Sequence, residues 1–380
     1  MRSRTLLALA AILLAQGAAA AQGAEPPRPP LPRNADPNDW EAYYDRGTDL
    51  LRTVPQQADQ YLYWAQRLNP ARAEPLYAHW VALHLQNVRR WDAYMHDDPR
   101  VVDSPEIIRM DSLLLRAQIR NPFLHRGLVV LLYGATSPSV SDTKFNRGLL
   151  QYFSGRLDLA VHTLSQYVEH DPRNLNARWS LVLALVSSGQ MDSAQAAMDT
   201  LVARLRERDE TRVVKVYESK ELQEYASGLL ALARNHPAEA RAAMEQAIVE
   251  NAASWYAHRG RAMALRVEQR PDEAAQEMAA ALELAPEDAL LRYDYGVALL
   301  EARRPAEAAA QFRRAVKLEP YWADAWLGLG DGERMAGHAA EAIAAYEQYL
   351  ALAPRGAAAT VQAVRDYLER LRQPAAAPAP

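Results

Sequence analysis

Small and apolar residues recur at a fixed spacing between Glu221 and Pro354. Segments of similar text, among them AEARAAMEQAIVENA and AEAAAQFRRAVKLEP, follow one another at a period of 34 residues. The alanines that mark this period are Ala240, Ala274, Ala308 and Ala342. A fixed period of this length predicts helix–turn–helix units stacked side by side.

The turns between the predicted helices repeat as well. Pro237, Pro271 and Pro305 stand at the start of each second helix, where the missing N–H of proline costs nothing. A glutamate follows two residues later, and the helix dipole favours an anion there. The residues expected to end the first helices in a left-handed cap are Gly155, Gly189, Asn235 and Gly337. Packing, capping and charge therefore agree on one frame.

Within the unit that starts at Ala289, Gly296 and Ala308 occupy the eighth and twentieth positions and Pro320 the thirty-second. This pattern resembles the tetratricopeptide repeat family. The resemblance implies an all-α fold, a right-handed α-solenoid of helix–turn–helix repeats. It also implies a scaffold that binds segments of other proteins, because most family members have that role. The expected units start near Ser141, Leu175, Glu221, Trp255, Ala289 and Ala323.

The first 21 residues have the composition of a secretory signal peptide. Arg2 and Arg4 precede an apolar run from Leu6 to Leu14, and small residues follow up to Ala21. The apolar run is too short for an ordinary membrane span, so we expect cleavage near Ala21 and no stable membrane span afterwards. The predicted location is the periplasm of a bacterium or the outside of the cell. An uncleaved anchor is the alternative.

The chain then divides into segments by composition. The expected segments are a Pro-rich linker at 22–37, a helical N-terminal block at 38–140, repeats one and two at 141–208, a helical insertion at 209–220, repeats three to six at 221–356, a capping helix at 357–372 and a disordered tail at 373–380. Proline-rich sequence prefers extended polyproline II, so the linker is expected to be a spacer that buries nothing. In the capping helix, Val364 and Leu368 belong to one apolar stripe that would shield the last repeat.

The N-terminal block matches the repeat pattern poorly. A degenerate repeat begins near Asp39, with Gly47 one place out of register. Further helices are expected at Pro75–Gln86, Val88–His96, Pro105–Arg120 and Pro122–Tyr133. The block is either a set of diverged repeats or a helical subdomain that covers the open end of the stack.

Candidate chemistry is sparse. The chain has no cysteine, and its nine histidines show no metal-ligand spacing, so we predict no metal, no cofactor and no catalytic residue. His96-Asp97-Asp98 is the nearest approach to a metal cluster, and a polar helix end explains it equally well. The formal net charge of −4 offers no basic excess for nucleic acid. The sequence therefore favours a protein that is not an enzyme.

The family resemblance implies that the second, fifth, ninth, twelfth and thirteenth positions of each first helix line a concave groove. The candidate groove residues are Phe145, Trp179, Tyr225, Tyr256, Arg259, Tyr293 and Arg334. Aromatic rings with arginines suit an extended peptide that has apolar anchors and acidic groups. Equally, these rings pack against neighbouring repeats or against the N-terminal block. The family's carboxylate clamp is absent, because no asparagine stands at a ninth position.

Two functional hypotheses follow. The first is an exported, non-enzymatic scaffold that binds protein segments through the concave face, in a cell-envelope assembly. The second is a binding protein for small envelope molecules or glycans that uses the Trp- and Tyr-rich N-terminal block. Stacking on sugar rings would require four tryptophans to be exposed, Trp40, Trp64, Trp80 and Trp91.

Overall fold

The computed structural model describes residues 25–95, 98, 100–124, 144–207 and 219–372. All regular structure in these ranges is helical. The repeats form antiparallel helix pairs: α8 (Lys144–Phe153) with α9 (Leu157–His170), α10 (Leu175–Ser187) with α11 (Met191–Arg206), α12 (Lys220–Ala233) with α13 (Pro237–Glu250), α14 (Trp255–Val267) with α15 (Pro271–Leu284), α16 (Ala289–Glu301) with α17 (Pro305–Leu318), and α18 (Ala323–Met335) with α19 (Ala339–Leu352). The all-α solenoid is confirmed.

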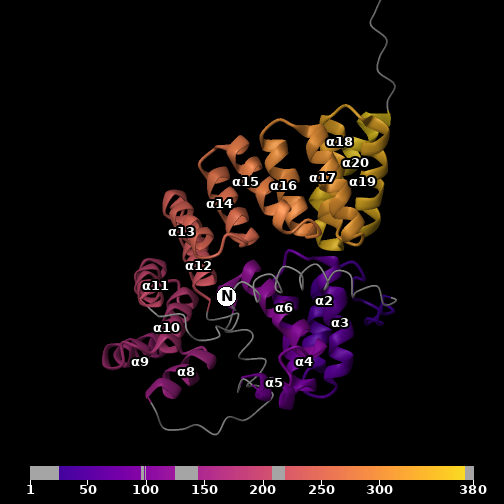
Figure 1. Ribbon diagram of the computed structural model, residues 1–380. Helices are drawn as coiled ribbons and strands as arrows, with labels where there is room; N and C mark the ends of the chain where they lie inside the picture. The colour runs from indigo at the N-terminus through magenta and orange to yellow at the C-terminus, as the bar shows by residue number, and fades with distance from the viewer. Residues whose placement is uncertain (1–24, 96–97, 99, 125–143, 208–218, 373–380) are drawn as a thin grey trace, which may run out of the picture.

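Successive pairs form one curved array. Figure 1 shows the array running from α8 and α9 at the lower left, through α12 to α15, to the last helices at the upper right. Each helix packs chiefly against its sequence neighbours. This is the arrangement expected of a repeat protein, in which each unit contacts only adjacent units.

Small residues let the paired helices approach closely. Phe312 of α17 is fully buried and lies between Gly296 of α16 and Gly328 of α18. A Cβ atom at Gly296 would lie 2.7 Å from Cε1 and Cζ of this ring. The family frame predicted the role of Gly296, and the structure adds Gly328 as the second wall of the same ring site.

The predicted left-handed caps are present. Gly155, Gly189, Asn235 and Gly337 all have φ between 60° and 85°. The equivalent residues of the two remaining repeats, Gln269 (φ 60°) and Arg303 (φ 58°), adopt this conformation as well. The turn therefore imposes its geometry even where the side chain does not favour it. The predicted prolines also begin α13, α15 and α17.

The N-terminal block contains α2 (Trp40–Leu50), α3 (Pro55–Leu68), α4 (Glu74–Gln86), α5 (Val88–Met95), α6 (Pro105–Arg120) and the short 3-10 helix η2 (Pro122–Leu124). The helices α2 and α3 pack as a pair, and Gly47 lies against Leu62 as a repeat glycine would. Helices were expected where α4, α5 and α6 lie. The helix expected at Pro122–Tyr133 begins as the 3-10 turn η2, and residues 125–133 lie outside the described ranges.

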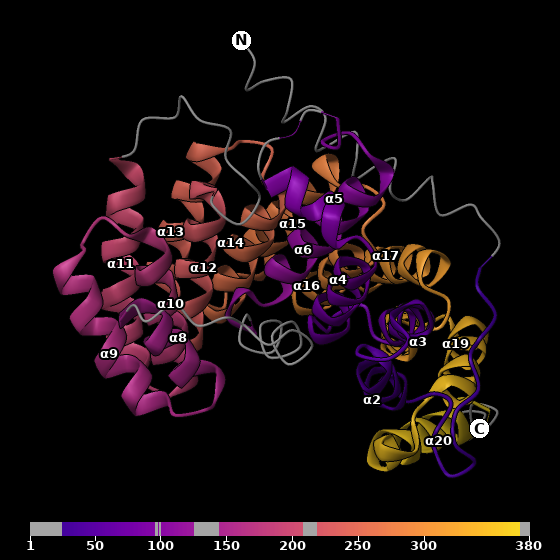
Figure 2. The same ribbon diagram turned by 90° about the horizontal axis from the view of Figure 1, so that it is seen from below.

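The block lies inside the curve of the array. In Figure 1 its helices lie below the helices from α14 to α20, and in Figure 2, seen from below, they lie over α14 to α17. The tyrosine hydroxyl of Tyr225 in α12 donates a hydrogen bond to the carbonyl of Ile119 in α6, at 2.9 Å. The block therefore contacts the concave face of the repeats and not only an end of the stack.

The expectation that the Pro-rich linker buries nothing is wrong. Residues 25–38, which we call the N-terminal strap, run across α3 and reach the last repeats. Pro29 is buried, and the Arg28 guanidinium lies 5.1 Å from the Trp64 ring and 6.0 Å from the Tyr321 ring. Asp36 accepts a hydrogen bond from the backbone N–H of Arg355 at 2.6 Å. Charged and aromatic partners thus hold a segment whose composition alone predicts a spacer.

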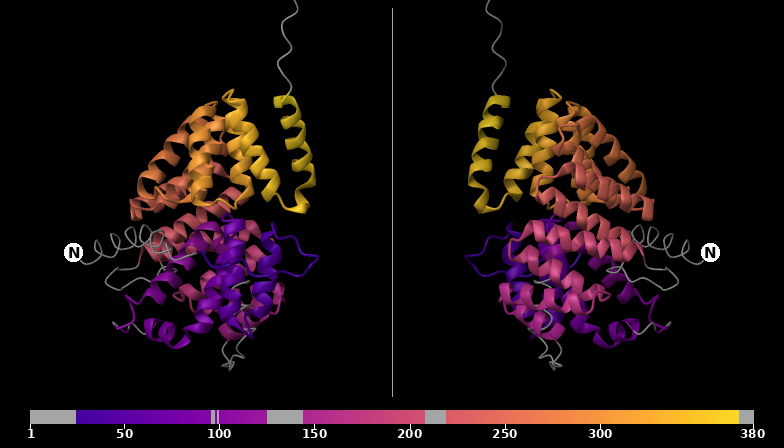
Figure 3. Two further views of the ribbon diagram at one scale, coloured as in Figure 1. Left: turned by 90° about the vertical axis from the view of Figure 1, so that its right-hand side faces the viewer. Right: turned by 90° about the vertical axis from the view of Figure 1, so that its left-hand side faces the viewer.

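The capping helix is confirmed. Helix α20 (Ala358–Arg372) follows η4 (Arg355–Ala357) and buries Val364 and Leu368 against the last repeat. Figure 3 shows α20 standing at the end of the array. The predicted signal peptide, most of the predicted insertion and the C-terminal tail lie outside the described ranges. None of the helices described is both long and apolar enough to span a membrane.

The close contact at Gly296 gives a stability prediction. Helix propensity alone would favour Gly296→Ala by about 1 kcal/mol. We expect a net loss of about 1 kcal/mol or more, because the added Cβ meets the buried Phe312 ring and overpacks the site. Denaturant unfolding measures the change. Gly356→Ala is the control, because no heavy atom lies within 4 Å of its Cβ position. A stabilised Gly296→Ala protein would contradict the packing described.

Candidate functional site

The predicted groove residues occupy the first helices of the repeats, and their exposure differs. Tyr225 and Tyr256 are buried, with 1% and 6% of their surface exposed. The other five are partly buried. The structure therefore divides the candidate set into side chains that a partner can reach and side chains that are already covered.

The covered part of the groove holds the end of α6. Ile119 is fully buried in one apolar cluster with Tyr225, Tyr256 and Met244. Leu115, one helical turn earlier, packs against the same cluster. The rings of Tyr225 and Tyr256 meet edge to face with centroids 5.2 Å apart. A partner can contact these two rings only where α6 has left the groove.

Ion pairs line the same part of the groove. The guanidinium of Arg259 donates to Asp294 at 2.6 Å, and that of Arg120 lies 3.6 Å from Asp288. Burial acts to raise the pKa of Asp288, but Arg120 and the Leu291 backbone N–H hold that pKa below its ordinary value. Asp288 also caps α16 through its bond to Leu291. One carboxylate therefore starts a helix and neutralises a buried arginine.

Two predicted residues lie at the first repeats. The ring of Phe145 lies 5.4 Å from that of Tyr167, and the ring of Trp179 lies 6.0 Å from that of Phe123. Phe123 belongs to η2, directly after α6, so Trp179 also contacts the N-terminal block. Both rings are partly exposed.

The remaining two lie at the last repeats. Tyr293 packs against Phe312 and Trp322, and burial raises its pKa to about 12. Arg334 donates to the Tyr346 hydroxyl at 2.9 Å, and its guanidinium lies 4.7 Å from the Tyr367 ring. The structure does not gather the seven candidates into one patch. They spread along the inner side of the array.

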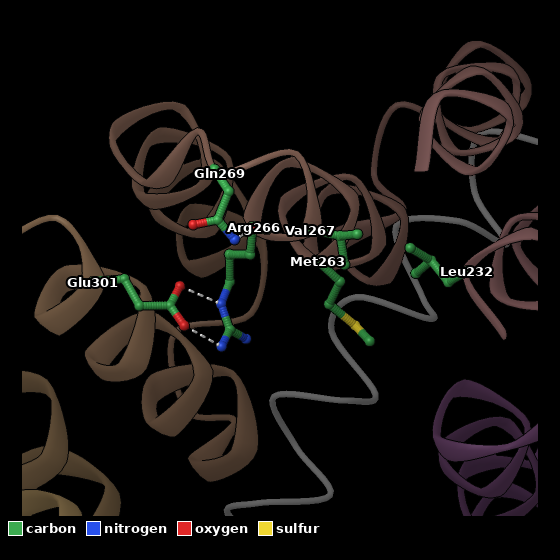
Figure 4. A pocket seen from close by; sticks show the side chains of 6 residues that line it. All are labelled: Leu232, Met263, Arg266, Val267, Gln269 and Glu301. Atoms are coloured by element: carbon green, nitrogen blue, oxygen red, sulfur yellow. Dashed lines mark hydrogen bonds and ion pairs between the residues drawn. The ribbon is translucent and has the colours of Figure 1, made fainter. Parts of the chain in front are cut away.

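An open hollow of about 390 Å³ lies beside the covered part of the groove. Figure 4 shows Arg266 and Glu301 paired on one side and the apolar side chains on the other. Two nitrogens of Arg266 donate to the two carboxylate oxygens of Glu301, at 2.7 and 2.6 Å. Val267 is 46% exposed. The hollow is lined by Leu232, Met263, Arg266, Val267, Gln269 and Glu301.

The hollow uses the ninth, twelfth and thirteenth positions of the first helices. Met263 is a ninth-position residue, Leu232 and Arg266 are twelfth, and Val267 and Glu301 are thirteenth. The candidate set does not include these residues; it took Arg334 from a twelfth position and its other members from second and fifth positions. The repeat register names these groove positions in every unit, so it is the sequence signal that points to them.

The N-terminal tryptophans do not form an open platform. Trp64, Trp80 and Trp91 expose 4%, 4% and 8% of their surface. Trp80 stacks on His84, with ring centroids 5.1 Å apart, and meets Trp91 edge to face. The hypothesis of sugar binding on exposed rings is wrong for these three. Trp40 is partly exposed, and the Arg72 guanidinium lies 4.9 Å from its ring.

Metal-binding geometry is absent from the described ranges, where no three His, Asp or Glu side chains could together hold an ion. His96 and Asp97 of the sequence candidate lie outside those ranges. His79 is buried between Asp59 and Arg109, and burial lowers its pKa. Its two ring nitrogens both have polar partners, so a packing role accounts for it.

Comparisons with known families agree with the geometry. Two profiles, each described as tetratricopeptide repeat, match residues 154–214, 225–289 and 293–357, about half of the chain. The chain belongs to the tetratricopeptide repeat family. Membership gives it a fold that supports binding of proteins or peptides. A search of curated proteins found no match.

Several solved structures have a similar fold at low identity. YrrB, described as a TPR protein with an unusual peptide-binding site, is 16% identical with a TM-score of 0.41, over 53% of this chain and 97% of that one. MamA is 18% identical with a TM-score of 0.39, over 47% of this chain and 90% of that one. The APC/C hetero-tetramer Cut9-Hcn1 is 14% identical with a TM-score of 0.45, over 88% of this chain and 63% of that one. Identities this low bear on the fold alone.

A partly buried contact between an arginine and a carboxyl group joins the N-terminal block to the last repeats. Arg67 of α3 pairs with Glu319 and donates to the Leu318 carbonyl at 3.2 Å. Burial raises the pKa of Glu319 to about 7, while Arg67 and Arg116 oppose the rise. The negative charges of Asp288 and Glu25, which lie near it, raise the pKa of Glu319 further.

The raised pKa of Glu319 predicts that the free energy of unfolding depends on pH. The folded protein keeps a proton on Glu319 at pH values where the unfolded chain, with a pKa near 4.5, has lost it. Stability from this group is therefore full below about pH 4.5 and is lost as the pH rises through about 7. We expect wild type to lose about 1 to 3 kcal/mol relative to Glu319→Gln between pH 5 and pH 7.5.

Denaturant unfolding at several pH values measures this difference. Glu347→Gln changes an exposed glutamate of α19 and serves as the control, with a pH slope that matches wild type. If the free energies of unfolding of wild type and Glu319→Gln changed in parallel with pH, Glu319 would already be ionised in the folded protein at pH 5.

Proposed function

We propose that this protein is an exported, non-enzymatic scaffold that binds segments of other proteins on the concave face of its solenoid, within a cell-envelope assembly. The basic start, apolar run and small residues of the first 21 positions support export. The family's use of this fold supports a protein or peptide partner.

The observation that carries the proposal is the hollow on the concave face. It combines apolar side chains, which anchor a partner by burial, with the Arg266–Glu301 pair, which offers hydrogen bonds to a peptide backbone. The adjoining groove already holds Ile119 of the same chain and bonds its carbonyl. The concave face thus contacts protein segments through both side-chain burial and main-chain bonds.

Substitution of Val267 tests this site. Val267→Arg places a charged side chain at the exposed apolar wall of the hollow, so we expect at least a tenfold loss of partner capture from a cell-envelope extract. The fold should be unchanged, because 46% of Val267 is exposed. Quantitative mass spectrometry of the captured proteins measures the loss, and circular dichroism checks folding.

Val249→Arg is the matched control. Val249 is also an exposed valine near a helix end, 72% exposed in α13, but it does not line the hollow. Capture that survives Val249→Arg and is lost with Val267→Arg supports the proposal. Capture that survives both substitutions would place the binding surface elsewhere.

A further inference from the structure

The groove between α12, α14 and α16 already contains a protein segment, the last turn of α6. Ile119 is fully buried there, and Leu115 packs beside it. The contacts of this seated segment show which chemistry the groove selects. Two of them, one to the main chain and one to a side chain, are specific.

The main-chain contact selects a helix C-terminus. Helix α6 ends at Arg120, so the carbonyl of Ile119 lies in the last turn, where carbonyls have no partner within the helix. The Tyr225 hydroxyl supplies that partner at 2.9 Å. A carbonyl in the middle of a helix already accepts a backbone bond. The Tyr225 hydroxyl therefore finds a carbonyl that lacks a backbone partner only in a helix that ends at this place.

The side-chain contact selects a cation. Arg120 follows Ile119, its side chain is 3% exposed, and it lies 3.6 Å from the Asp288 carboxylate. A segment without a cation here would remove the positive charge that acts most strongly on the partly buried Asp288 carboxylate, which is costly. The neighbouring Asp294 is occupied by Arg259. The groove thus matches an apolar residue followed directly by an arginine.

Most of the core of the N-terminal block lies outside the groove. Most of its buried apolar residues form clusters within the block, separate from those of the repeats. The contacts that join the two parts include ion pairs, hydrogen bonds and ring contacts, such as Arg67 with Glu319 and Trp64 with Tyr321. Interfaces of this polar kind between parts of one chain resemble transient protein interfaces.

We propose that this groove recognises a helix C-terminus of a partner protein that presents an apolar residue followed by an arginine, and that the end of α6 is an internal competitor for the same site. The inference rests on the proposed function and names the segment that the scaffold binds. The apparent affinity for the partner falls in proportion to the fraction of molecules in which α6 fills the groove.

A peptide with the sequence of residues 109–122, RMDSLLLRAQIRNP, is the probe. Labelled with fluorescein, it is titrated with the full chain, as wild type and as Arg120→Ala, and anisotropy measures binding. We expect at least tenfold tighter binding to Arg120→Ala, because its competitor is weakened. A second peptide with glutamine at the position of Arg120 should bind at least tenfold more weakly. Equal affinities in either comparison would overturn the proposal.

Two further measurements do not depend on the folding of Arg120→Ala. Excess peptide should increase hydrogen exchange of the α6 end in the wild-type protein, because it displaces that end, and unchanged exchange would overturn the proposal. Tyr225→Phe removes only the hydroxyl that bonds the α6 end, so in the absence of peptide it should increase hydrogen exchange of that end about threefold to tenfold. A dimer of Arg120→Ala that excludes the peptide would overturn it in favour of a second copy as occupant.

The two proposals can fail separately. Loss of capture with Val267→Arg together with absent peptide binding would leave the scaffold function intact and reject only the helix-end site. Capture that is indifferent to Val267→Arg, with absent peptide binding, would reject both.

Discussion

The contact between the end of α6 and the concave face of α12, α14 and α16 helps to fix the position of the N-terminal block within the curve of the repeats. Among the described helices of the array, the pairs in closest contact belong to one repeat or to neighbouring repeats, so these contacts act locally. The buried Ile119, the bond from Tyr225 and the Arg120–Asp288 pair instead join residues far apart in sequence. The N-terminal strap adds a second long-range connection, through Arg28 beside Tyr321 and Asp36 beside Arg355. Together they hold the N-terminal block inside the curve of the repeats.

The repeats themselves could be predicted almost completely from the sequence. Their structure depends on short-range rules: a small residue opposite a ring, as at Gly296 and Phe312, and a proline or a left-handed residue at fixed places. The exceptions were Gln269 and Arg303, which adopt the cap conformation without a residue type that favours it. Backbone bonds close both turns, from Arg270 to the Leu265 carbonyl and from Arg304 to the Leu299 carbonyl, and such bonds do not depend on the side chain at the cap position.

The candidate site could be predicted only in part. The repeat register identified the concave face and placed Tyr225, Tyr256 and Arg259 on it. The burial of both tyrosines depends on Ile119, more than 100 residues earlier, and periodic spacing carries no information about such a pair. The Pro-rich strap was misjudged for a similar reason. Its composition predicts an exposed spacer, whereas the aromatic surface that holds Arg28 comes from α2, α3 and the last repeats.

The concave face therefore has two parts, an open hollow and a groove filled by the chain's own helix end. The chain contains no cysteine, so a pair introduced at Asn38 and Arg355 can carry spin labels at chosen sites. Asn38 donates to Ala351 at 3.0 Å, and Arg355 is bonded to Asp36. Dipolar spectroscopy of this pair tests directly whether the N-terminal strap is held against the last repeats. The account predicts one short, narrow distance distribution. A broad distribution at long distances would contradict it.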